Sequence, residues 1–324
     1  MIRPLGLQDL AHLNRTRNRG IFLDSAPTLL WGRAVVPLGA LLSSFSAVTG
    51  VFTSIANAGE DALIGQIAHT HGSSFAHFTF LAPESAAGGG RFPELVEHLI
   101  QRAGARGAQS LIAELDEQSA MLGVLRAAGF SIYARQRIWR LGHKLDGARD
   151  GWRRAEFRDG LAANLLCSGL VPGLVQQVEP TPWDGLSGYV NYQRGELAAY
   201  VDLRRGPRGQ WLQPFVALDA PEAGALLAGL FARLRPRRGR PLYICVRSYQ
   251  SWLEPHLRAL GAQPSPRQAV VVKRTARPVK AAEGRRLPVA EGRRAEPTTP
   301  IQMPTPFVRR ELELMSYDQT TNYR

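Results

Sequence analysis

The stretch that decides the fold is SLIAELDEQSAMLGVLRAAGFSIYARQRIWR, which runs from Ser110 to Arg140. Its pattern returns, with no gap, as LYICVRSYQSWLEPHLRALGAQPSPRQAVVV, from Leu242 to Val272. Both stretches combine an apolar strand, an amphipathic helix that ends at a glycine, and a second strand. Identical residues recur at one constant spacing, namely Ile112/Ile244, Gln118/Gln250, Ser119/Ser251, Leu125/Leu257, Arg126/Arg258, Ala127/Ala259, Gly129/Gly261, Arg135/Arg267 and Gln136/Gln268. A match in residues, spacing and order indicates an internal duplication.

Shorter matches extend the duplication upstream of both stretches. An arginine and an aspartate with the same spacing occur near the start of each half, and a Leu-x-Pro motif precedes each stretch. The matching pairs are Arg3/Arg153, Asp9/Asp159 and Leu81–Pro83/Leu212–Pro214. Because these matches keep their order along the chain, they indicate that a whole domain is repeated.

We therefore predict two tandem domains, residues 1–142 (copy one) and 150–275 (copy two), each with the order β, α, α, β, β, β, α, β, α, β. Hairpins followed by alternating helices and strands are typical of an α/β (α+β) fold, here a mixed, mostly antiparallel sheet flanked by helices. Residues 276–324 are rich in proline and arginine and lack apolar periodicity, so we expect a disordered tail. In copy one the expected strands are 2–4, 49–57, 62–70, 74–82, 109–115 and 130–141, and the expected helices are 8–15, 28–43, 92–106 and 118–128.

Composition and charge exclude several classes of protein. The chain has 324 residues, of which 44% are hydrophobic and 21% are charged, which excludes a wholly disordered or fibrous protein. Its formal net charge is +13, and almost all of the positive charge comes from arginine. Charge is the only feature that would indicate a nucleic-acid partner, so we do not expect one. No stretch predicts a signal peptide or a membrane span, and Cys167 and Cys245 form no metal motif. We expect a cytoplasmic protein with no membrane partner.

Copy one carries a glycine-rich loop between an apolar strand and a helix. The strand ends at Leu81–Pro83, the loop contains Gly88, Gly89 and Gly90, and the helix begins near Phe92. Glycines let successive backbone N–H groups converge on one place, and a helix N-terminus adds partial positive charge. The pattern favours an anion site suited to a pyrophosphate, and it also fits a plain flexible loop.

With these features the chain resembles a tandem of two GNAT domains, of the N-acetyltransferase superfamily. The resemblance rests on Leu81-Ala82-Pro83, the glycine loop, the helix from Phe92, and Arg126-Ala127-Ala128-Gly129-Phe130 before the last strand. It implies two acyl-CoA N-acyltransferase-like domains and acetyl-CoA as co-substrate. The pantetheine would pair with a strand edge where two strands splay apart, and the pyrophosphate would lie on the loop. The cofactor contacts that it implies are Phe78, Phe80, Leu81, Gly88, Gly89, Gly90, Arg91 and Gln118.

Both copies depart from the family pattern at positions that matter for the chemistry. The basic or amide residue of the family's loop is replaced by Ala86, and the tyrosine that protonates the leaving thiolate is replaced by Leu125. The corresponding loop of copy two has no glycine and carries Asp219 and Glu222, which would repel phosphates. Copy two is therefore expected to be a degenerate copy that does not bind CoA.

Three side chains of copy one are candidates for the base that would deprotonate an amine. Glu114 and Glu117 lie at the end of strand 109–115, and His77 lies in strand 74–82. A carboxylate or an imidazole with a pKa shifted towards neutrality can accept a proton from an ammonium group. The alternative for both glutamates is that they solvate a helix start. No third ligand accompanies the histidines of this region, so no metal site is predicted.

These observations leave two hypotheses for the function. In the first, copy one is an acyltransferase that transfers an acetyl group from acetyl-CoA to the amine of a small molecule or peptide by direct attack. In the second, the chain is a non-catalytic module that keeps the fold and binds an acyl-CoA or another ligand, which Ala86 and Leu125 favour. The loops that select the acceptor vary most in such folds, so the prediction names the class of the acceptor, an amine, and not one compound.

Overall fold

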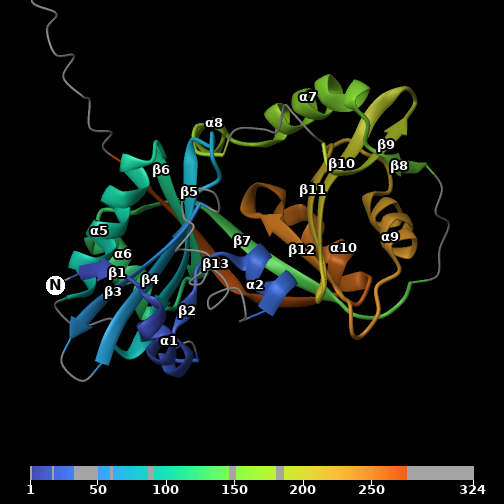
Figure 1. The fold of residues 1–324 in the computed structure, drawn as a ribbon. Coiled ribbons are helices and arrows are strands. Elements are labelled where there is room, and N and C mark those ends of the chain that lie inside the picture. Colours follow the sequence, from blue (N-terminus) through green and yellow to red (C-terminus); the bar gives the residue numbers. More distant parts are fainter. Residues whose placement is uncertain are drawn as a thin grey trace, which may run out of the picture. The chain divides into compact units, whose positions relative to one another are not determined.

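The computed structural model describes residues 2–16, 18–32, 50–58, 61–86, 91–145, 151–179 and 186–275 of the chain (Figure 1). The predicted tail, 276–324, and the loop glycines Gly88, Gly89 and Gly90 lie outside these residues. Within them, thirteen strands form one mixed sheet in the order β1-β3-β4-β5-β6-β13-β7-β12-β11-β10-β9-β8, and β2 pairs with β5 off this path. No helix of the described residues is long and apolar enough to cross a lipid bilayer.

Copy one has the predicted order of elements, with one additional strand, β2. Its elements are β1 (Ile2–Pro4), the 3-10 helix η1 (Leu7–Asp9), α1 (Leu10–Thr16), β2 (Ile21–Phe22), α2 (Ser25–Trp31), β3 (Val51–Ala58), β4 (Asp61–Ala68), β5 (Phe75–Ala82), η4 (Glu84–Ala86), α5 (Phe92–Ala105), β6 (Ser110–Asp116), α6 (Ala120–Ala127) and β7 (Ser131–Leu141). The predicted helix 28–43 begins earlier, at Ser25, and its predicted part beyond Gly32 lies outside the described residues.

Copy two also has the predicted order of elements, without a described counterpart of β2 or η4. Its elements are β8 (Trp152–Arg154), η5 (Phe157–Asp159), α7 (Gly160–Leu170), α8 (Gly173–Gln176), β9 (Gly188–Gln193), β10 (Glu196–Gly206), β11 (Gly209–Val216), α9 (Ala223–Leu234), β12 (Leu242–Arg247), η6 (Ser248–Leu253), α10 (Glu254–Ala259) and β13 (Gln263–Arg274). In both copies a hairpin of antiparallel strands comes first and a parallel pair follows, β5 with β6 and β11 with β12.

The last strands of the two copies are exchanged. β13, from copy two, lies between β6 and β7 and pairs with both, whereas β7, from copy one, pairs with β12. Figure 1 shows the two strands, green and orange, side by side along their length. The sheet of each copy is therefore completed by a strand from the other copy.

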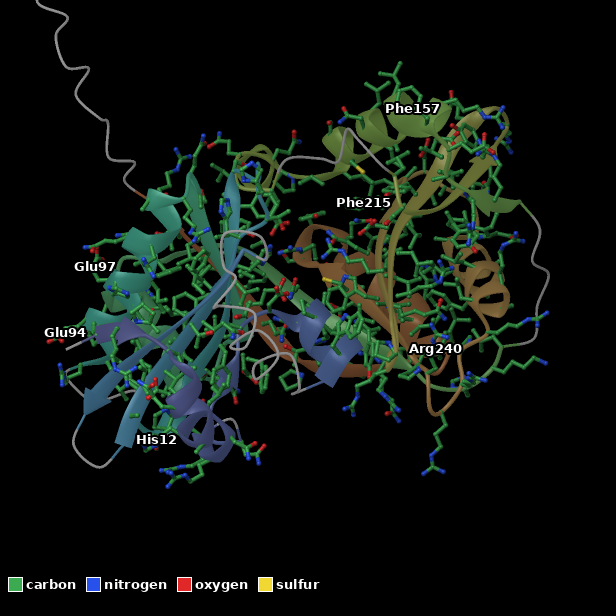
Figure 2. All side chains as sticks on the ribbon, viewed as in Figure 1. His12, Glu94, Glu97, Phe157, Phe215 and Arg240 are labelled. Atoms are coloured by element: carbon green, nitrogen blue, oxygen red, sulfur yellow. The ribbon has the colours of Figure 1, made fainter. Side chains whose placement is uncertain are left out.

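The hydrophobic cores follow this exchange. α5 turns Leu95 and Leu99 towards the sheet, where both are fully buried, and leaves Glu94 and Glu97 exposed on its outer side (Figure 2). The same core of copy one contains Val271 of β13, which is also fully buried. Copy one therefore depends on an apolar side chain encoded near the end of copy two.

The matched pairs Arg3/Arg153 and Asp9/Asp159 occupy equivalent local structures. Arg3 makes two hydrogen bonds to the carboxylate of Asp9, at 2.6 and 2.7 Å, and Arg153 makes two to Asp159, at 2.6 and 2.5 Å. In each copy the aspartate also accepts a backbone N–H, from Gly6 in copy one and from Glu156 in copy two. These contacts confirm the duplication at the first strand and helix.

The Leu-x-Pro correspondence, in contrast, is wrong. Pro83 follows the end of β5, whereas Pro214 lies inside β11. The parallel pairs Phe75 with Ser110 and Gln210 with Leu242 align the two strands, because Ser110 and Leu242 are equivalent in the duplication. Counting from these pairs places Pro214 at the position of Thr79 and not at the position of Pro83.

Candidate functional site

The two parallel strand pairs splay apart after their first residues. β5 and β6 pair from Phe75 with Ser110 to His77 with Ile112, and the described ladder ends there. β11 and β12 pair from Gln210 with Leu242 to Leu212 with Ile244, and their ladder ends at the same point. Beyond these pairs the facing edges of both strands need other hydrogen-bond partners.

In copy one, residues 19–25, here called the inserted segment, occupy the space between the splayed strands. Its strand β2 is antiparallel to β5, with Ile21 opposite Leu81 and Phe22 opposite Phe80. On either side of this pairing Leu23 N donates to Thr79 O at 3.0 Å, and Glu84 N donates to Arg19 O at 2.8 Å. On its other side, Leu23 O accepts from Glu114 N of β6 at 2.8 Å. The segment therefore joins β5 to β6 as an extra strand.

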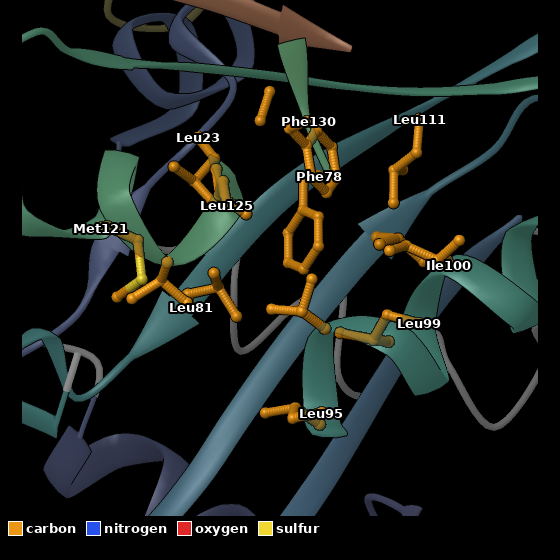
Figure 3. Packing of buried hydrophobic residues seen from close by; sticks show 14 of the residues in the cluster. Leu23, Phe78, Leu81, Leu95, Leu99, Ile100, Leu111, Met121, Leu125 and Phe130 are labelled. Atoms are coloured by element: carbon orange, nitrogen blue, oxygen red, sulfur yellow. The ribbon is translucent and has the colours of Figure 1, made fainter. Parts of the chain in front are cut away.

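Apolar packing holds the inserted segment in place. Leu23 is fully buried in the core cluster that also contains Phe78, Leu125 and Phe130 (Figure 3). Gly20 lies so close to β5 that a Cβ added there would stand 2.6 Å from Ala82 Cβ. Leu125, the residue at the family's tyrosine position, thus faces an apolar side chain of the chain itself.

In copy two, a single side chain closes the corresponding strand edge. Gln250 Nε2 donates to Pro214 O at 2.9 Å, and Val216 N donates to Gln250 Oε1 at 3.1 Å. Gln250 is 2% exposed, and its carboxamide takes the place of one peptide unit beside β11. Since Pro214 corresponds to Thr79, both copies use the chain itself to satisfy the same position of the same strand edge.

The predicted cofactor residues that lie within the described ranges are not brought together at an open cleft. Phe78, Phe80 and Leu81 are fully buried, and the edge of β5 that they share is the one that the inserted segment occupies. Gln118 is exposed, and its backbone N–H is bonded to the Asp116 side chain at 2.9 Å. Arg91 lies at the start of α5 with its Nε 3.7 Å from Glu94 Oε2.

Two of the three predicted bases, His77 and Glu114, line one cavity. Glu117 does not line this cavity, because its Oε1 pairs with Arg135 Nε at 2.6 Å on the surface. The cavity has a volume of about 450 Å³ and lies between the two copies, and we call it the interface cavity. Its lining includes Asp24, His77 and Glu114 from copy one, and Trp211, Phe215 and Arg247 from copy two.

The copy-one wall of the interface cavity is acidic. Glu114 is 8% exposed and accepts a hydrogen bond from Ser25 N at 3.1 Å. Asp24 Oδ2 stands 3.7 Å from His77 Nδ1, which has no hydrogen-bond partner among the described residues. Burial raises the pKa of Asp24 to about 6; His77 opposes the shift and the Glu114 carboxylate adds to it. A carboxylate with a pKa near neutrality can bind a cation or accept a proton.

The copy-two wall carries a buried arginine. Arg247 is 5% exposed, and its Nη2 donates to both carboxylate oxygens of Glu179, at 2.8 and 2.9 Å. Tyr133 of β7 donates a further hydrogen bond to Glu179. Nε and Nη1 of Arg247 are buried without a hydrogen-bond partner among the described residues. Two donors of a buried cation thus remain unsatisfied in the protein interior behind this wall.

Sequence reasoning missed Asp24, Glu179 and Arg247. Asp24 is the first acid after the short apolar run 21–23, and this run was the available signal for the inserted segment. Arg247 directly follows the predicted strand of copy two, at the position of Leu115 in copy one. An arginine in place of a leucine in an otherwise matching repeat could have indicated that copy two also contributes to the cavity. No three His, Cys, Asp or Glu side chains of the described residues are placed to hold a metal ion.

Comparison with known proteins identifies the fold. No protein-family model matches the sequence, and no curated protein matches it. A solved structure of a GCN5-related N-acetyltransferase from Sphaerobacter thermophilus matches with a TM-score of 0.50 at 14% identity, over 85% of this chain and 95% of that one. A tandem GNAT protein from the clavulanic acid biosynthesis pathway matches with a TM-score of 0.47 at 14% identity, over 85% and 98% of the two chains. At this identity the likeness concerns the fold alone. The chain therefore has the fold of the GNAT N-acetyltransferases, built twice in tandem.

Proposed function

We propose that the chain is a ligand-binding module on an acetyltransferase fold, and that the interface cavity is its binding site. The observation that carries this proposal is the inserted segment, whose backbone satisfies the β5 edge from Thr79 to Glu84. The family resemblance assigns this edge to the pantetheine of acetyl-CoA. An edge that is already hydrogen-bonded along its length offers no pairing groups to a cofactor.

The remaining groups of the described site do not fit acetyl-CoA either. Leu23 is buried in the same apolar cluster as Leu125, and Gln118 is exposed. In copy two the Gln250 carboxamide takes the equivalent edge, and Glu222 begins the helix that would meet a pyrophosphate. Both copies thus support a fold that has been kept while the cofactor cleft has been closed.

Calorimetry with acetyl-CoA tests this proposal. The wild-type chain is expected to give no binding heat at millimolar acetyl-CoA, and micromolar binding at a 1:1 ratio would overturn the proposal. Two variants examine the cause: Leu23→Pro removes the N–H that Thr79 O accepts, whereas Leu23→Ala keeps it. If the segment closes the cleft through its backbone, any gain in acetyl-CoA binding appears in Leu23→Pro and not in Leu23→Ala, with folding checked by circular dichroism.

Acetyl transfer from acetyl-CoA to a small-molecule or peptide amine is the second candidate function. It is favoured by one observation, that Glu114 and His77 line the interface cavity beside the point where β5 and β6 separate. Either group can accept a proton from an ammonium ion, whereas Glu117 is held by Arg135. A thiol-release assay over a panel of amines tests it: turnover that Glu114→Gln abolishes would establish this function.

We place the protein in the cytoplasm. Cys167 and Cys245 are both buried and unpaired, and burial raises the pKa of each thiol to about 12. Thiols of this kind are typical of proteins in a reducing compartment. Cell fractionation with an antibody to the chain tests this assignment.

A further inference from the structure

Two arginine-rich segments of copy two lie against each other. Residues 203–210, around the turn from β10 to β11, contain three arginines, and residues 233–240, at the end of α9, contain five. Neither segment contains an aspartate or a glutamate. Gln210 N donates to Pro241 O at 3.0 Å, and Gln210 Nε2 donates to Leu234 O at 3.2 Å. Stretches that are far apart in sequence therefore form one positively charged surface.

Three arginines of this surface meet at Tyr189. Arg154 lies directly opposite Tyr189 in the β8–β9 pair, so both side chains lie on one face of the sheet. Arg205 follows Val201, the β10 residue opposite Tyr189, by four positions and lies on the same face. Arg233 of α9 has its Cζ 5.5 Å from the centre of the Tyr189 ring. Burial alone would raise the pKa of Tyr189, but hydrogen bonding to these three arginines outweighs it and lowers the pKa.

The charge of this surface is not neutralised by the chain. We call the exposed arginines of residues 205–208 and 233–238, together with the exposed Arg154, the basic face. The ion pairs of the surrounding strands and helices involve other arginines, namely Arg153, Arg158 and Arg204, so no carboxylate of the described residues pairs with the basic face. Gathered positive charge attracts polyanions, and exposed guanidinium groups bind phosphate oxygens through paired N–H donors.

An exposed aromatic side chain borders the basic face. Arg208 N donates to Leu30 O at 3.1 Å, and a Cβ added to Gly32 would stand 2.5 Å from Arg208 Nη1. Between these two residues, Trp31 is 53% exposed, whereas Leu30 is buried in a cluster with Trp211 of β11. The bases of a single strand stack on aromatic side chains of this kind, while its phosphates bind arginines.

We propose that the basic face binds single-stranded nucleic acid, with phosphates on its arginines and a base stacked on Trp31. Charge in the sequence was not sufficient for this inference. The structure adds that the arginines share one surface without acids, and that an exposed tryptophan lies beside Arg208. Copy two supplies the arginines and copy one supplies Trp31, so the strand would contact both copies. The inference is independent of the proposed function, because no residue of the basic face lines the interface cavity.

Fluorescence anisotropy of the full chain with labelled 15-nucleotide oligo-dT and oligo-U tests the proposal at pH 7.5. If about four arginines contact phosphates, the logarithm of the association constant should fall against that of the salt concentration with a slope of about −2.8. Affinity should then drop about twenty-fold from 50 to 150 mM NaCl. Such binding supports the proposal, and the order of the two oligonucleotides identifies the strand as DNA or RNA. No binding of either at 50 mM NaCl, or equal or tighter binding of a 15-base-pair duplex, would overturn it.

Variants of the basic face separate a site from a general effect of charge. Arg205→Gln combined with Arg233→Gln removes two phosphate contacts and should make the slope shallower by about 1.4. Arg126→Gln combined with Arg194→Gln removes two exposed arginines outside the basic face, so the net charge changes equally and the slope should stay as in the wild type. If the two double variants alter binding alike, positive charge acts without a site and the proposal fails.

Trp31→Ala tests the stacked base. This variant should bind oligo-dT about ten-fold more weakly than the wild type, with the same salt slope, because a stacking surface and no charge is lost. Phe157→Ala removes a 92% exposed aromatic outside the basic face and is the control, expected to bind like the wild type. Wild-type affinity in Trp31→Ala would overturn the single-strand assignment.

Competition with acetyl-CoA keeps this test apart from that of the proposed function. Millimolar acetyl-CoA should not displace oligo-dT, because one molecule carries far fewer phosphates than the oligonucleotide does. Displacement that the double variant Arg205→Gln, Arg233→Gln abolishes would assign the basic face to a small phosphate compound and overturn the nucleic-acid proposal, while the β5 edge would remain closed.

Discussion

Gln136 of β7 and Gln268 of β13 lie opposite each other in the middle of the sheet, and Gln136 Nε2 donates a hydrogen bond of 2.9 Å to Gln268 Oε1. The two glutamines are also equivalent positions of the duplicated sequence. Equivalent residues that meet each other mark an approximate twofold relationship between the copies, in which β7 pairs with β12 and β13 pairs with β6. The stability of each copy therefore depends on residues of the other.

Replacement of Val271 by alanine tests this dependence. Val271 belongs to copy two in sequence but is fully buried in the core of copy one, so loss of two methyl groups should cost about 1–2 kcal/mol of unfolding free energy. Hydrogen exchange should accelerate at the β6 amides that pair with β13. Arg274→Ala, an exposed change in the same strand, is the control and should shift stability by less than about 0.5 kcal/mol. Unchanged β6 protection in Val271→Ala would contradict the exchange.

We expect the Gln250 side chain to stabilise the fold far more than its counterpart in copy one, Gln118, does. Gln250→Leu leaves Pro214 O and Val216 N buried without partners, so we expect a loss of about 2–4 kcal/mol in urea unfolding. The matched control is Gln118→Leu, at the equivalent position, where the side chain is exposed and the change should stay within about 0.5 kcal/mol. Equal effects of the two substitutions would show that Gln250 does not close the β11 edge.

Gly20→Ala should loosen the inserted segment. The added Cβ would stand 2.6 Å from Ala82 Cβ, and overpacking of this kind costs about 1–3 kcal/mol. Amide exchange at Glu84, whose N–H donates to Arg19 O, should increase with it. Gly123→Ala in α6 is the control: apart from its chain neighbours and the backbone of its own helix, no atom lies within 4 Å of its added Cβ, and alanine should stabilise this helix by about 0.5–1 kcal/mol. A Gly20→Ala chain as stable as the wild type would mean that the segment does not lie against β5.

The inserted segment could not be predicted from apolar periodicity, although the strands around it could. β5 and β6 are long enough to show as apolar runs, whereas β2 is Ile21–Phe22, too short for a period of two to appear. What makes these two residues a strand is the unpaired edge of β5, and that edge exists only after the sheet has formed. The separation of β5 from β6 is thus a tertiary feature that decides a local structure.

The strand exchange is hidden for a different reason. β7 and β13 descend from the same repeated sequence, so their apolar patterns are equally compatible with β6 and with β12. Periodicity assigns faces to a strand but does not choose between two equivalent partners. The duplication was readable from residues such as Gln136 and Gln268, whereas the partner of each last strand was not.

At the candidate site, the alternation of side chains along β6 explains which of them reach the interface cavity, whereas closeness in sequence does not. Leu111, Ala113 and Leu115 face the core of copy one, and Ile112 faces a cluster shared with copy two. Glu114 lies on the face of Ile112, which explains why it reaches the interface cavity. Glu117 follows the strand and turns to Arg135 on the surface, so its closeness in sequence to Glu114 carried no information about the site.

Asp24→Asn should stabilise the chain at neutral pH. Burial raises the pKa of Asp24 to about 6, and the charged groups that face it are His77 from β5, Glu114 from β6 and Arg204 from β10. The unfolded value is about 3.9, so the folded chain binds the proton more tightly than the unfolded chain does. Wild-type stability should therefore fall as the pH rises from about 4 to about 6 and level off above it.

Asparagine has no such titration, so the variant should exceed the wild type by about 1–3 kcal/mol at pH 7, and the difference should shrink towards pH 4. Urea unfolding at pH 4.5, 5.5 and 7 measures it. Asp219→Asn, at an exposed position, is the control and should not change the pH dependence. A constant difference between Asp24→Asn and the wild type across this range would mean that the Asp24 carboxyl has the same pKa in the folded and unfolded chains. The negative charge of the acidic wall would then not destabilise the folded chain.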